Sequence, residues 1–334
     1  MNLNLLWLLL SLLGAFLTAV LLAPLFIKLF TKKNVGQNVL NYVEQHQSKS
    51  GTPTMGGWIF IVPTLIFSLI AFSTFSLVAC ACILSYGLIG FFDDFLKFRY
   101  HRNLGLKAYQ KIIAQFGAAL ILAIFCFKNP NIGSFITLPF TNVEWNMGWL
   151  FVPFCAFGFI ALTNGVNLTD GLDGLAGWCG VAYFSVFTAL IWFLHIDAVS
   201  AQNFVLANEL FSLAIFSTSI LGGVLGYLWF NSYPAKIMMG DTGSLALGGA
   251  ASAVAFFSRQ PLLIFFAGIM FVVSCISVIL QVTSFKLTKK RIIKMAPFHH
   301  HLELCGVHES KIVMWYFIIS ILGGVISILA MRAI

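Results

Sequence analysis

The sequence predicts an all-α protein that crosses a membrane many times. Hydrophobic residues make up 60% of the 334 positions and only 9% are charged, against about 25% in ordinary soluble domains. The mean hydropathy is +0.94, and Phe alone contributes 35 residues. Such a chain cannot cover a globular surface with polar groups, which excludes a soluble enzyme, a disordered chain and a collagen-like chain. We therefore expect a polytopic integral membrane protein with one catalytic domain over residues 1–334.

Ten hydrophobic runs follow one another along the chain, and each is expected to form a helix. They cover residues 3–30, 57–73, 74–92, 110–127, 147–163, 175–194, 209–230, 242–257, 261–283 and 313–330. A spanning helix needs about 20 apolar residues, and these runs are not the alternating segments of about ten residues that outer-membrane barrels show. The second and third runs adjoin, so their division is placed near Ser73 and Thr74. The expectation is about ten transmembrane helices.

Basic residues are concentrated in alternate connections between these runs. All but three of the 19 Lys and Arg residues lie in odd-numbered connections or at the adjoining helix ends. Because basic residues are retained on the cytoplasmic side, the odd connections are expected to be cytoplasmic and both termini to lie outside. The net charge of +8 then faces one side, which suits anionic headgroups or a phosphorylated substrate. No basic domain stands clear of the membrane, so nucleic acid is not expected as a partner.

Acidic residues are also one-sided, and they point to a functional site. All but three of the 11 lie on the predicted cytoplasmic side, and five are aspartates at helix mouths: Asp93, Asp94, Asp170, Asp173 and Asp241. A carboxylate near hydrocarbon is costly unless it is paired or bound to a metal. Since three connections each place Asp beside Gly and hydroxyl or amide side chains, we expect one composite site at the membrane face.

The first two of these connections combine glycine-rich and acidic sequence. Lys49-Ser-Gly-Thr-Pro-Thr-Met-Gly-Gly57 leads into the second helix, as an anion site at a helix start or as an ordinary helix entry. Asp93 and Asp94 end the third helix, where adjacent side chains point about 100° apart. One could hold a metal while the other handles a proton, and Lys97 is one turn from Asp93. The alternative is a solvated helix end with a surface salt bridge.

The next two connections carry the remaining aspartates. Asp170 and Asp173 are three residues apart, hence on one face if the segment is helical, with Asn167 and Thr169 beside them; helix capping would explain only one of these acids. Asp241 follows Gly240 and is a plausible N-cap. An aspartate among glycines and hydroxyls also suits Mg²⁺, which takes few carboxylates and keeps waters or substrate phosphates.

The ninth connection contains three consecutive histidines. Pro297-Phe-His299-His300-His301-Leu-Glu303 follows a basic stretch at 286–294. Zinc is one interpretation, but adjacent side chains diverge and zinc sites space their ligands further apart. Hydrogen bonding to a sugar, phosphate or peptide fits this spacing better, and a solvated loop is the third alternative.

Five motifs in this order give the chain a resemblance to a known family. They are Gly51-Thr-Pro-Thr-Met-Gly-Gly57, Asp93-Asp94, Asn167-Leu-Thr-Asp-Gly-Leu-Asp173, Met239-Gly-Asp-Thr-Gly-Ser244 and Pro297-Phe-His-His-His-Leu-Glu303. Together they closely resemble the phospho-N-acetylmuramoyl-pentapeptide transferases of bacterial cell-wall synthesis, over nearly the whole chain. The histidine triplet favours this family over polyprenyl-phosphate N-acetylglucosamine-1-phosphate transferases, which are the alternative.

The resemblance implies a reaction, a cofactor and a location. UDP-N-acetylmuramoyl-pentapeptide and undecaprenyl phosphate would give lipid I and UMP, with Mg²⁺ required, in the inner membrane of a bacterium and with a homodimer as the expected assembly. Because two anionic phosphates must approach each other, a divalent cation and lysines are needed to offset their repulsion. The lipid phosphate is confined to the bilayer, so the site must open at the boundary between membrane and cytoplasm.

The resemblance also implies roles for single residues. Asp241 and Asp94 would hold the metal, and Asp93 would deprotonate the lipid phosphate; a second route makes Asp241 a covalent nucleophile. The implied nucleotide and diphosphate pocket consists of Lys49, Asn167, Asp170, Asp173 and Asn231, with Asp173 at the uracil. The implied sugar and peptide contacts are Thr54, Gln281, His300 and His301. Lys97 and Lys111 would handle phosphate.

Two other classes of protein share parts of this pattern. A secondary transporter also carries acids in its membrane region, but it should place them near the bilayer midplane. A structural membrane protein would leave the one-sided aspartates unexplained. The sequence therefore favours the enzyme over both.

Overall fold

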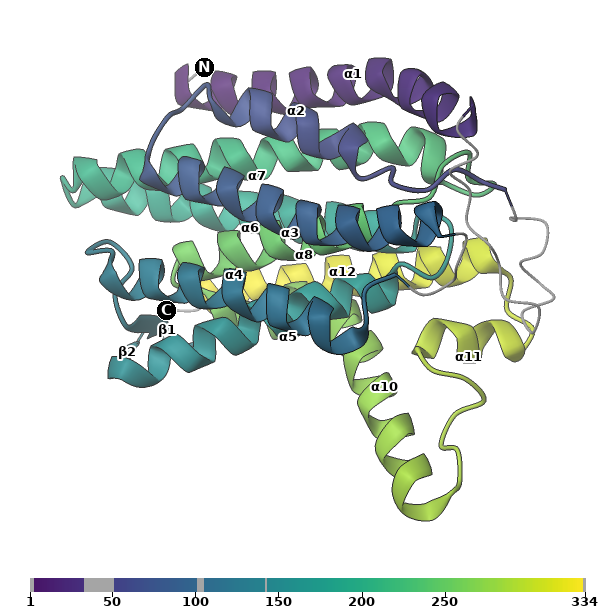
Figure 1. Cartoon of the computed structure of the whole chain (residues 1–334). Helices are drawn as coiled ribbons and strands as arrows, with labels where there is room; N and C mark the ends of the chain where they lie inside the picture. Colours follow the sequence, from purple (N-terminus) through teal and green to yellow (C-terminus); the bar gives the residue numbers. More distant parts are fainter. Residues whose placement is uncertain (1–2, 33–50, 101–104, 142, 333–334) are drawn as a thin grey trace.

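The computed structural model describes residues 3–32, 51–100, 105–141 and 143–332. These residues form an α-helical bundle with one small two-stranded sheet (Figure 1). The elements in chain order are α1 (Leu3–Lys32), α2 (Trp58–Ser68), α3 (Thr74–Arg99), α4 (Ala108–Lys128), β1 (Phe135–Thr137), β2 (Glu144–Asn146), η2 (Gly148–Leu150), α5 (Phe151–Thr169), α6 (Leu175–Ser200), α7 (Phe204–Asn231), α8 (Gly240–Phe257), η3 (Pro261–Leu263), α9 (Ile264–Ala267), α10 (Ile269–Thr288), α11 (Phe298–Leu304) and α12 (Glu309–Arg332).

Each of the ten hydrophobic runs contains a helix, which confirms the predicted polytopic all-α class. Eight helices of the described chain are long and apolar enough to cross a membrane. The other two runs give α2, which has 11 residues, and α8, which has 18. The ninth run is divided into η3, α9 and α10, with Gly268 between α9 and α10.

The helix α8 lies in the centre of the bundle. All of its residues from Thr242 to Phe257 are buried, and it packs on α3 and α5. Small residues allow this close approach, as in other helix pairs of membrane proteins. A Cβ atom added to Gly90 of α3 would overlap the backbone carbonyl of Asp241, and one added to Gly57 would overlap the backbone of Gly243. The start of α8 is thereby held between α3 and the chain entering α2.

The break between α2 and α3 is stabilised by a carboxylate from α7. Ser73 is the N-cap of α3 and forms a capping box with Ser76, which confirms the division expected near Ser73. The Oε2 atom of Glu209 accepts hydrogen bonds from Ser73 Oγ at 2.8 Å and from the Phe75 amide at 2.7 Å. Glu209 is 9% exposed. This acid therefore serves a helix N-terminus, where a negative charge is favourable.

Replacing Glu209 by Ala is expected to destabilise the protein by about 2–4 kcal/mol, because two buried donors lose their acceptor. Glu209→Gln keeps one acceptor oxygen and should cost less. Glu144→Ala is the matched control, since its carboxylate is 52% exposed in an ion pair with Arg259 and such pairs contribute little. Thermal unfolding in detergent measures the difference, and equal melting temperatures for Glu209→Ala and Glu144→Ala would contradict this role.

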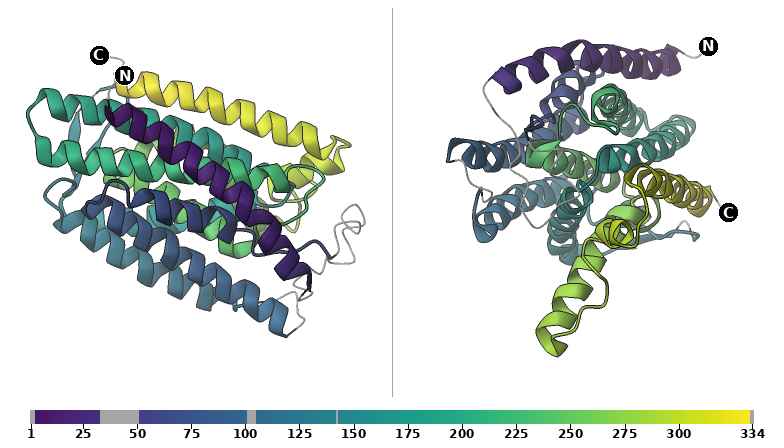
Figure 2. Two further views of the ribbon diagram at one scale, coloured as in Figure 1. Left: turned by 90° about the horizontal axis from the view of Figure 1, so that it is seen from above. Right: turned by 90° about the vertical axis from the view of Figure 1, so that its right-hand side faces the viewer.

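Two features of the fold were not predicted. The strands β1 and β2 pair antiparallel, with Phe135 opposite Asn146, and the hairpin is joined to the bundle where the Thr137 amide donates to the Arg259 carbonyl at 2.9 Å. The helix α10 leaves the bundle at a steep angle to the other long helices and projects sideways (Figures 1 and 2). The short helix α11 then returns the chain to α12.

Candidate active site

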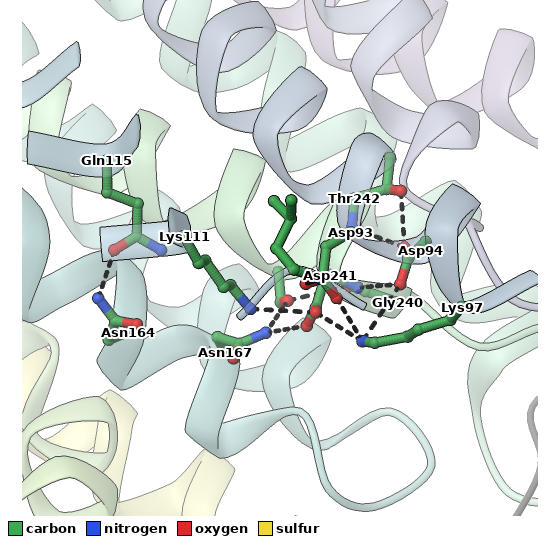
Figure 3. A network of polar contacts seen from close by, with 12 residues as sticks. Asp93, Asp94, Lys97, Lys111, Gln115, Asn164, Asn167, Gly240, Asp241 and Thr242 are labelled. Atoms are coloured by element: carbon green, nitrogen blue, oxygen red, sulfur yellow. Dashed lines mark hydrogen bonds and ion pairs between the residues drawn. The ribbon is translucent and has the colours of Figure 1, made fainter. Parts of the chain in front are cut away.

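Three carboxylates from two distant segments meet (Figure 3). They lie where α3 ends and α8 begins, and we call this end of the bundle the site end. Asp93 and Asp94 lie in the last two turns of α3, and Asp241 lies in the first turn of α8. Each offers an oxygen atom, and these oxygens lie within 4.8 Å of one another. Asp93 and Asp94 are each 3% exposed. The structure therefore brings together three of the five aspartates that the sequence analysis singled out, and these three residues form the aspartate cluster.

Asp94 binds the N-terminus of α8. Its carboxylate accepts hydrogen bonds from the Asp241 amide at 3.2 Å, from the Thr242 amide at 2.9 Å and from Thr242 Oγ1 at 2.7 Å. Asp241 is therefore not the N-cap, which was one interpretation of the sequence. The carboxylate of Asp94 from α3 accepts these amide hydrogen bonds instead. The same bonds hold the Asp241 side chain at the end of α3.

Two lysines offset the charge of the aspartate cluster. Lys97 Nζ lies 2.6 Å from Asp93 Oδ2, 3.8 Å from Asp94 Oδ1 and 2.7 Å from Asp241 Oδ2. Lys111 Nζ of α4 lies 3.0 Å from Asp241 Oδ2. The predicted pairing of Lys97 with Asp93 is confirmed, but Lys97 also reaches the other two acids. Because three carboxylates face two ammonium groups, the cluster keeps a net negative charge when all five are ionised.

Amide side chains complete the surroundings of Asp241. Asn167 Nδ2 of α5 donates to Asp241 Oδ1 at 2.6 Å and to Ser244 Oγ at 2.8 Å. One turn earlier, Asn164 Nδ2 donates to Gln115 Oε1 at 2.7 Å, and Gln115 lies one turn from Lys111 on α4. This second bond fastens α4 to α5 beside the cluster. In Figure 3, Lys111 and Asn167 approach Asp241 from one side and Lys97 from the other.

Thr54 lies beside the aspartate cluster. Gly240 has φ 70°, a conformation that glycine adopts without strain, and a Cβ atom there would lie 2.5 Å from Asp94 Oδ2 and 2.7 Å from Thr54 Oγ1. The amides of Gly56 and Gly57 donate to the carbonyls of Met238 and Met239. Those two amides are therefore used to join two loops, and they do not form the exposed anion site that one interpretation of the glycine-rich segment proposed.

The residues between α5 and α6 form a turn that is fixed by two side chains and one backbone amide from other segments. Asp173 Oδ2 accepts from the Ala235 amide at 2.9 Å, and Glu309 Oε1 accepts from the Asp173 amide at 2.6 Å. Asn231 Oδ1 accepts from the Gly174 amide at 3.0 Å, while its Nδ2 donates to the Ile237 carbonyl at 2.8 Å. Asp173 and Asn231 are brought together here, in a turn that is not helical.

Asp170 begins this turn, as the residue that follows α5. Burial raises the pKa of its carboxyl to about 8, with the negative charges of Asp241, Asp94 and Asp173 adding to the effect. At neutral pH the metal-free protein therefore holds Asp170 largely protonated. The unfolded chain, with an ordinary Asp pKa near 3.9, binds fewer protons in the same range.

The stability of the metal-free protein is consequently expected to fall between about pH 4 and pH 8, because the unfolded chain releases a proton there that the folded state keeps. Asp170→Asn removes this contribution, so its melting temperature relative to wild type should rise across that window. Asp197→Asn, at an acid that is 51% exposed, is the control. Melting curves in EDTA at pH 5, 7 and 9 measure the effect, and parallel curves for wild type and Asp170→Asn would refute it.

The histidine motif forms α11, which packs on the Asp170–Asp173 turn. His299 is fully buried, and a Cβ atom on Gly171 would overlap its imidazole ring. His300 Nδ1 lies 2.7 Å from Glu303 Oε2, and His301 Nδ1 accepts from the Lys294 amide at 3.2 Å. His299, which had no role assigned from the sequence, thus anchors α11. His300 and His301 lie on the more accessible sides of this helix.

Of the remaining predicted site residues, Gln281 lies away from the aspartate cluster and Lys49 lies outside the described residues. Gln281 lies on α10, where its Oε1 accepts from the Ile292 and Ile293 amides at 3.0 and 3.1 Å and its Nε2 donates to the Ile293 carbonyl at 2.9 Å. Within the described residues, these hydrogen bonds join it to the chain after α10 and not to the aspartate cluster.

The donor chemistry of the aspartate cluster fits a hard divalent cation. Within the described part of the chain, no other group of three Asp, Glu, His or Cys residues brings its ligand atoms so close together. Carboxylate oxygens are ligands that Mg²⁺ prefers. Since Asp241 Oδ2 contacts both lysines, a cation bound there must displace at least one ammonium group.

Sequence reasoning missed several residues that shape this site. Gln115 is fully buried and holds Asn164, and Glu309 fixes the Asp173 amide. Gln115 interrupts an apolar run one turn after Lys111, and Glu309 opens the last hydrophobic helix. Burying an amide or an acid in such a position costs free energy unless the group is hydrogen-bonded. The presence of these polar residues in apolar sequence was therefore the feature that could have indicated their roles.

The fold and the site together define a polytopic membrane protein with a buried acidic cluster at one bundle end. Residues 75–259, which include all three members of the cluster, match the family model described as glycosyl transferase family 4.

The names of similar curated proteins identify a particular family within this class of membrane protein. A protein of Clostridium novyi is 43% identical over 300 residues, which cover 89% of this chain and 88% of the relative. A protein of Desulfitobacterium hafniense is 43% identical over 298 residues, with 87% of each chain covered, and one of Halalkalibacterium halodurans is 40% identical over 291 residues, with 85% of each covered. All three are named phospho-N-acetylmuramoyl-pentapeptide-transferase. The chain belongs to this family, as its five motifs predicted.

Proposed function

We propose that this protein transfers phospho-N-acetylmuramoyl-pentapeptide from UDP-N-acetylmuramoyl-pentapeptide to undecaprenyl phosphate, releasing UMP and forming lipid I. The observation that carries the proposal is the aspartate cluster with its two lysines, at the end of a membrane-embedded bundle whose relatives bear the name of this transferase. A polyprenyl-phosphate N-acetylglucosamine-1-phosphate transferase is not favoured, because the reported relatives carry the other name.

Asp241 and Asp94 are proposed to hold Mg²⁺, which would neutralise charge on the diphosphate and on the departing UMP. Asp94 fits this role because its bonds to the α8 backbone fix its position. Lys97 and Lys111 are proposed to release Asp241 and to bind phosphate oxygens of the two substrates. Their ammonium groups already lie within 3.0 Å of Asp241 Oδ2, where an anionic substrate would compete for them.

Asp93 is proposed to accept the proton of the lipid phosphate, in a single displacement of UMP. Its Oδ1 accepts from the Leu106 amide at 2.9 Å, and its Oδ2 contacts Lys97, so the carboxylate is held in a fixed position beside the proposed phosphate site. The covalent route through Asp241 is less well supported, because this carboxylate is proposed to hold Mg²⁺ and its Oδ1 already accepts from Asn167 Nδ2 at 2.6 Å. Rapid quenching of the reaction with labelled substrate tests this, since a phosphoryl-enzyme would require the covalent route.

The remaining residues are proposed to hold the rest of the nucleotide sugar. Asp173 and Asn231 shape the turns beside Asp170, which fits a pocket for uracil and diphosphate together with Asn167 and Lys49. Thr54 lies next to the cluster, and His300 and His301 lie on α11, next to the same turn, where the sugar and peptide would extend. Gln281 is proposed to act through the 292–293 backbone that it holds in place.

His301→Ala is expected to raise KM for the nucleotide sugar about tenfold and to change kcat by less than about threefold, as for a group that binds ground state and transition state alike. His308→Ala is the control, because His308 is an exposed histidine near the start of α12. Steady-state kinetics at saturating Mg²⁺ separate the two constants. A lower apparent affinity for Mg²⁺ in His301→Ala would instead support a metal role for α11.

The proposed setting is the inner membrane of a bacterium, with the site end facing the cytoplasm, both termini outside and a homodimer as the assembly. This orientation places the basic residues Lys97, Lys111 and Lys290 on the cytoplasmic face. Protease protection of tags at the two termini in intact cells would test it.

Substrate choice is tested with purified protein, undecaprenyl phosphate and Mg²⁺. UMP release with UDP-N-acetylmuramoyl-pentapeptide, and none with UDP-N-acetylglucosamine, is the expected result. Equal release with both sugars would overturn the assignment of substrate, and release with the second alone would establish the alternative.

A further inference from the structure

The helix α10 and the turn that follows it form a projecting arm, which we define as residues 276–294. The arm leaves the bundle sideways in two perpendicular views (Figures 1 and 2). Only 17% of the apolar part of α10 is buried in the protein, against 72% for α7. A helix whose apolar side chains are exposed all round is expected to be surrounded by lipid.

The tip of the arm carries five exposed cations within nine residues: Lys286, Lys289, Lys290, Arg291 and Lys294. No ion pair of the described residues neutralises any of them. Lys294 Nζ and Arg291 donate only to backbone carbonyls, of Leu304 and of Lys294. The tip is therefore strongly positive and uncompensated, unlike the lysines of the aspartate cluster.

Hydrogen bonds give the tip a defined shape. The Gln281 side chain binds the backbone of Ile292 and Ile293 through three bonds, and Ser284 Oγ donates to the Lys290 carbonyl at 2.9 Å. Lys289 ends α10 with φ 59°. The cations are thus presented on a fastened turn.

Apolar groups lie directly beside these cations. Leu287 is 78% exposed and Ile292 is 61% exposed, although both adjoin lysines or an arginine. A cavity of about 260 Å³ lies between α10 and the returning chain, lined by residues that include Ile276, Leu280 and Ile293. The arm therefore offers cations and lipid-soluble surface within one short segment, which an acidic soluble protein or a nucleic acid would not match.

We propose that the arm is a docking site for anionic phospholipid of the bilayer. The apolar side chains lie among acyl chains, and the five cations bind headgroup phosphates at the bilayer surface of the site end. Lys and Arg side chains beside apolar surface extend their charges to the headgroups in this way, and each contributes to attraction by an anionic leaflet. The arm is then an anchor that places α11 against the membrane surface.

The test measures lipid preference at the tip of the intact protein in vesicles. Leu287→Cys in a Cys305→Ser background carries a bimane label, and brominated phosphatidylglycerol or brominated phosphatidylcholine serves as the quencher. Stronger quenching by phosphatidylglycerol is expected, with a relative binding constant of about 5 or more. K290Q/R291Q should reduce this preference at least about threefold.

The matched control is K28Q/K32Q, which removes two exposed cations from the end of α1 and should leave the preference unchanged. Equal quenching by both lipids, or an unchanged preference in K290Q/R291Q, would overturn the proposal. In a further experiment, undecaprenyl phosphate is added at a few mole per cent. If it abolishes quenching by phosphatidylglycerol, the tip binds the carrier lipid and is not a docking site for bilayer phospholipid.

Discussion

Asp241→Asn is expected to lower the rate of UMP release by about 10³-fold or more, while the protein still inserts and folds. Asp241 contributes the oxygens that both lysines and Asn167 contact, so its carboxylate connects α3, α4 and α5. An amide of the same shape keeps much of the packing but loses the charge that a divalent cation requires. Turnover of radiolabelled nucleotide sugar at several Mg²⁺ concentrations provides the measurement.

The matched control for this variant is Asp197→Asn, at an exposed acid that pairs with Arg332. It should retain full turnover. Melting temperatures close to wild type in both proteins would show that folding is intact. Near-normal turnover of Asp241→Asn would remove the metal assignment at this residue, whatever the outcome for substrate choice.

Lys97→Met is expected to separate catalysis from cation binding. The ammonium group contacts all three carboxylates, so its loss leaves them facing Lys111 alone. Turnover should fall by about 10²–10³-fold, because the lysine ammonium group that stabilises charge on the phosphate is lost. Binding of Mn²⁺ as a probe should tighten instead, since a competing positive charge has left the carboxylate oxygens.

Lys97→Arg, which conserves the charge, and Lys128→Met, at a lysine distant from the cluster, serve as controls for this experiment. Arginine keeps the charge and should recover part of the turnover, whereas Lys128 lies at the far end of α4 and should be dispensable. Mn²⁺ affinity is read by electron paramagnetic resonance, and turnover by UMP release. If Lys97→Met loses both turnover and Mn²⁺ binding, the lysine supports the fold of the site and does not compete with the cation.

Much of the fold was predictable because hydrophobic run length sets helix formation in a membrane. Every run gave a helix, and even the break before Thr74 was placed correctly, since Ser73 is a good helix cap. The β1–β2 hairpin was not predictable, because its strands have three residues each and it is joined to Arg259, more than a hundred residues away. The direction of α10 likewise depends on packing and not on its own composition.

The candidate site was predictable in its acids but not in its connections. One-sided aspartates pointed to Asp93, Asp94 and Asp241, since buried carboxylates need partners. That Asp94 binds the amides of α8 could not be predicted, because the two segments are 147 positions apart. The role of His299 as the anchor of α11 was hidden for the same reason, as it depends on contact with Gly171.

The glycines around the start of α8 have a consequence for drug resistance. Gly57 and Gly90 touch the backbones of Gly243 and Asp241, where even a methyl group would overlap main-chain atoms. A point mutation at either position would disturb the aspartates together with any inhibitor seated on them. We therefore expect escape from such an inhibitor to arise at more tolerant places, such as the accessible faces of α11, and rarely at these two glycines.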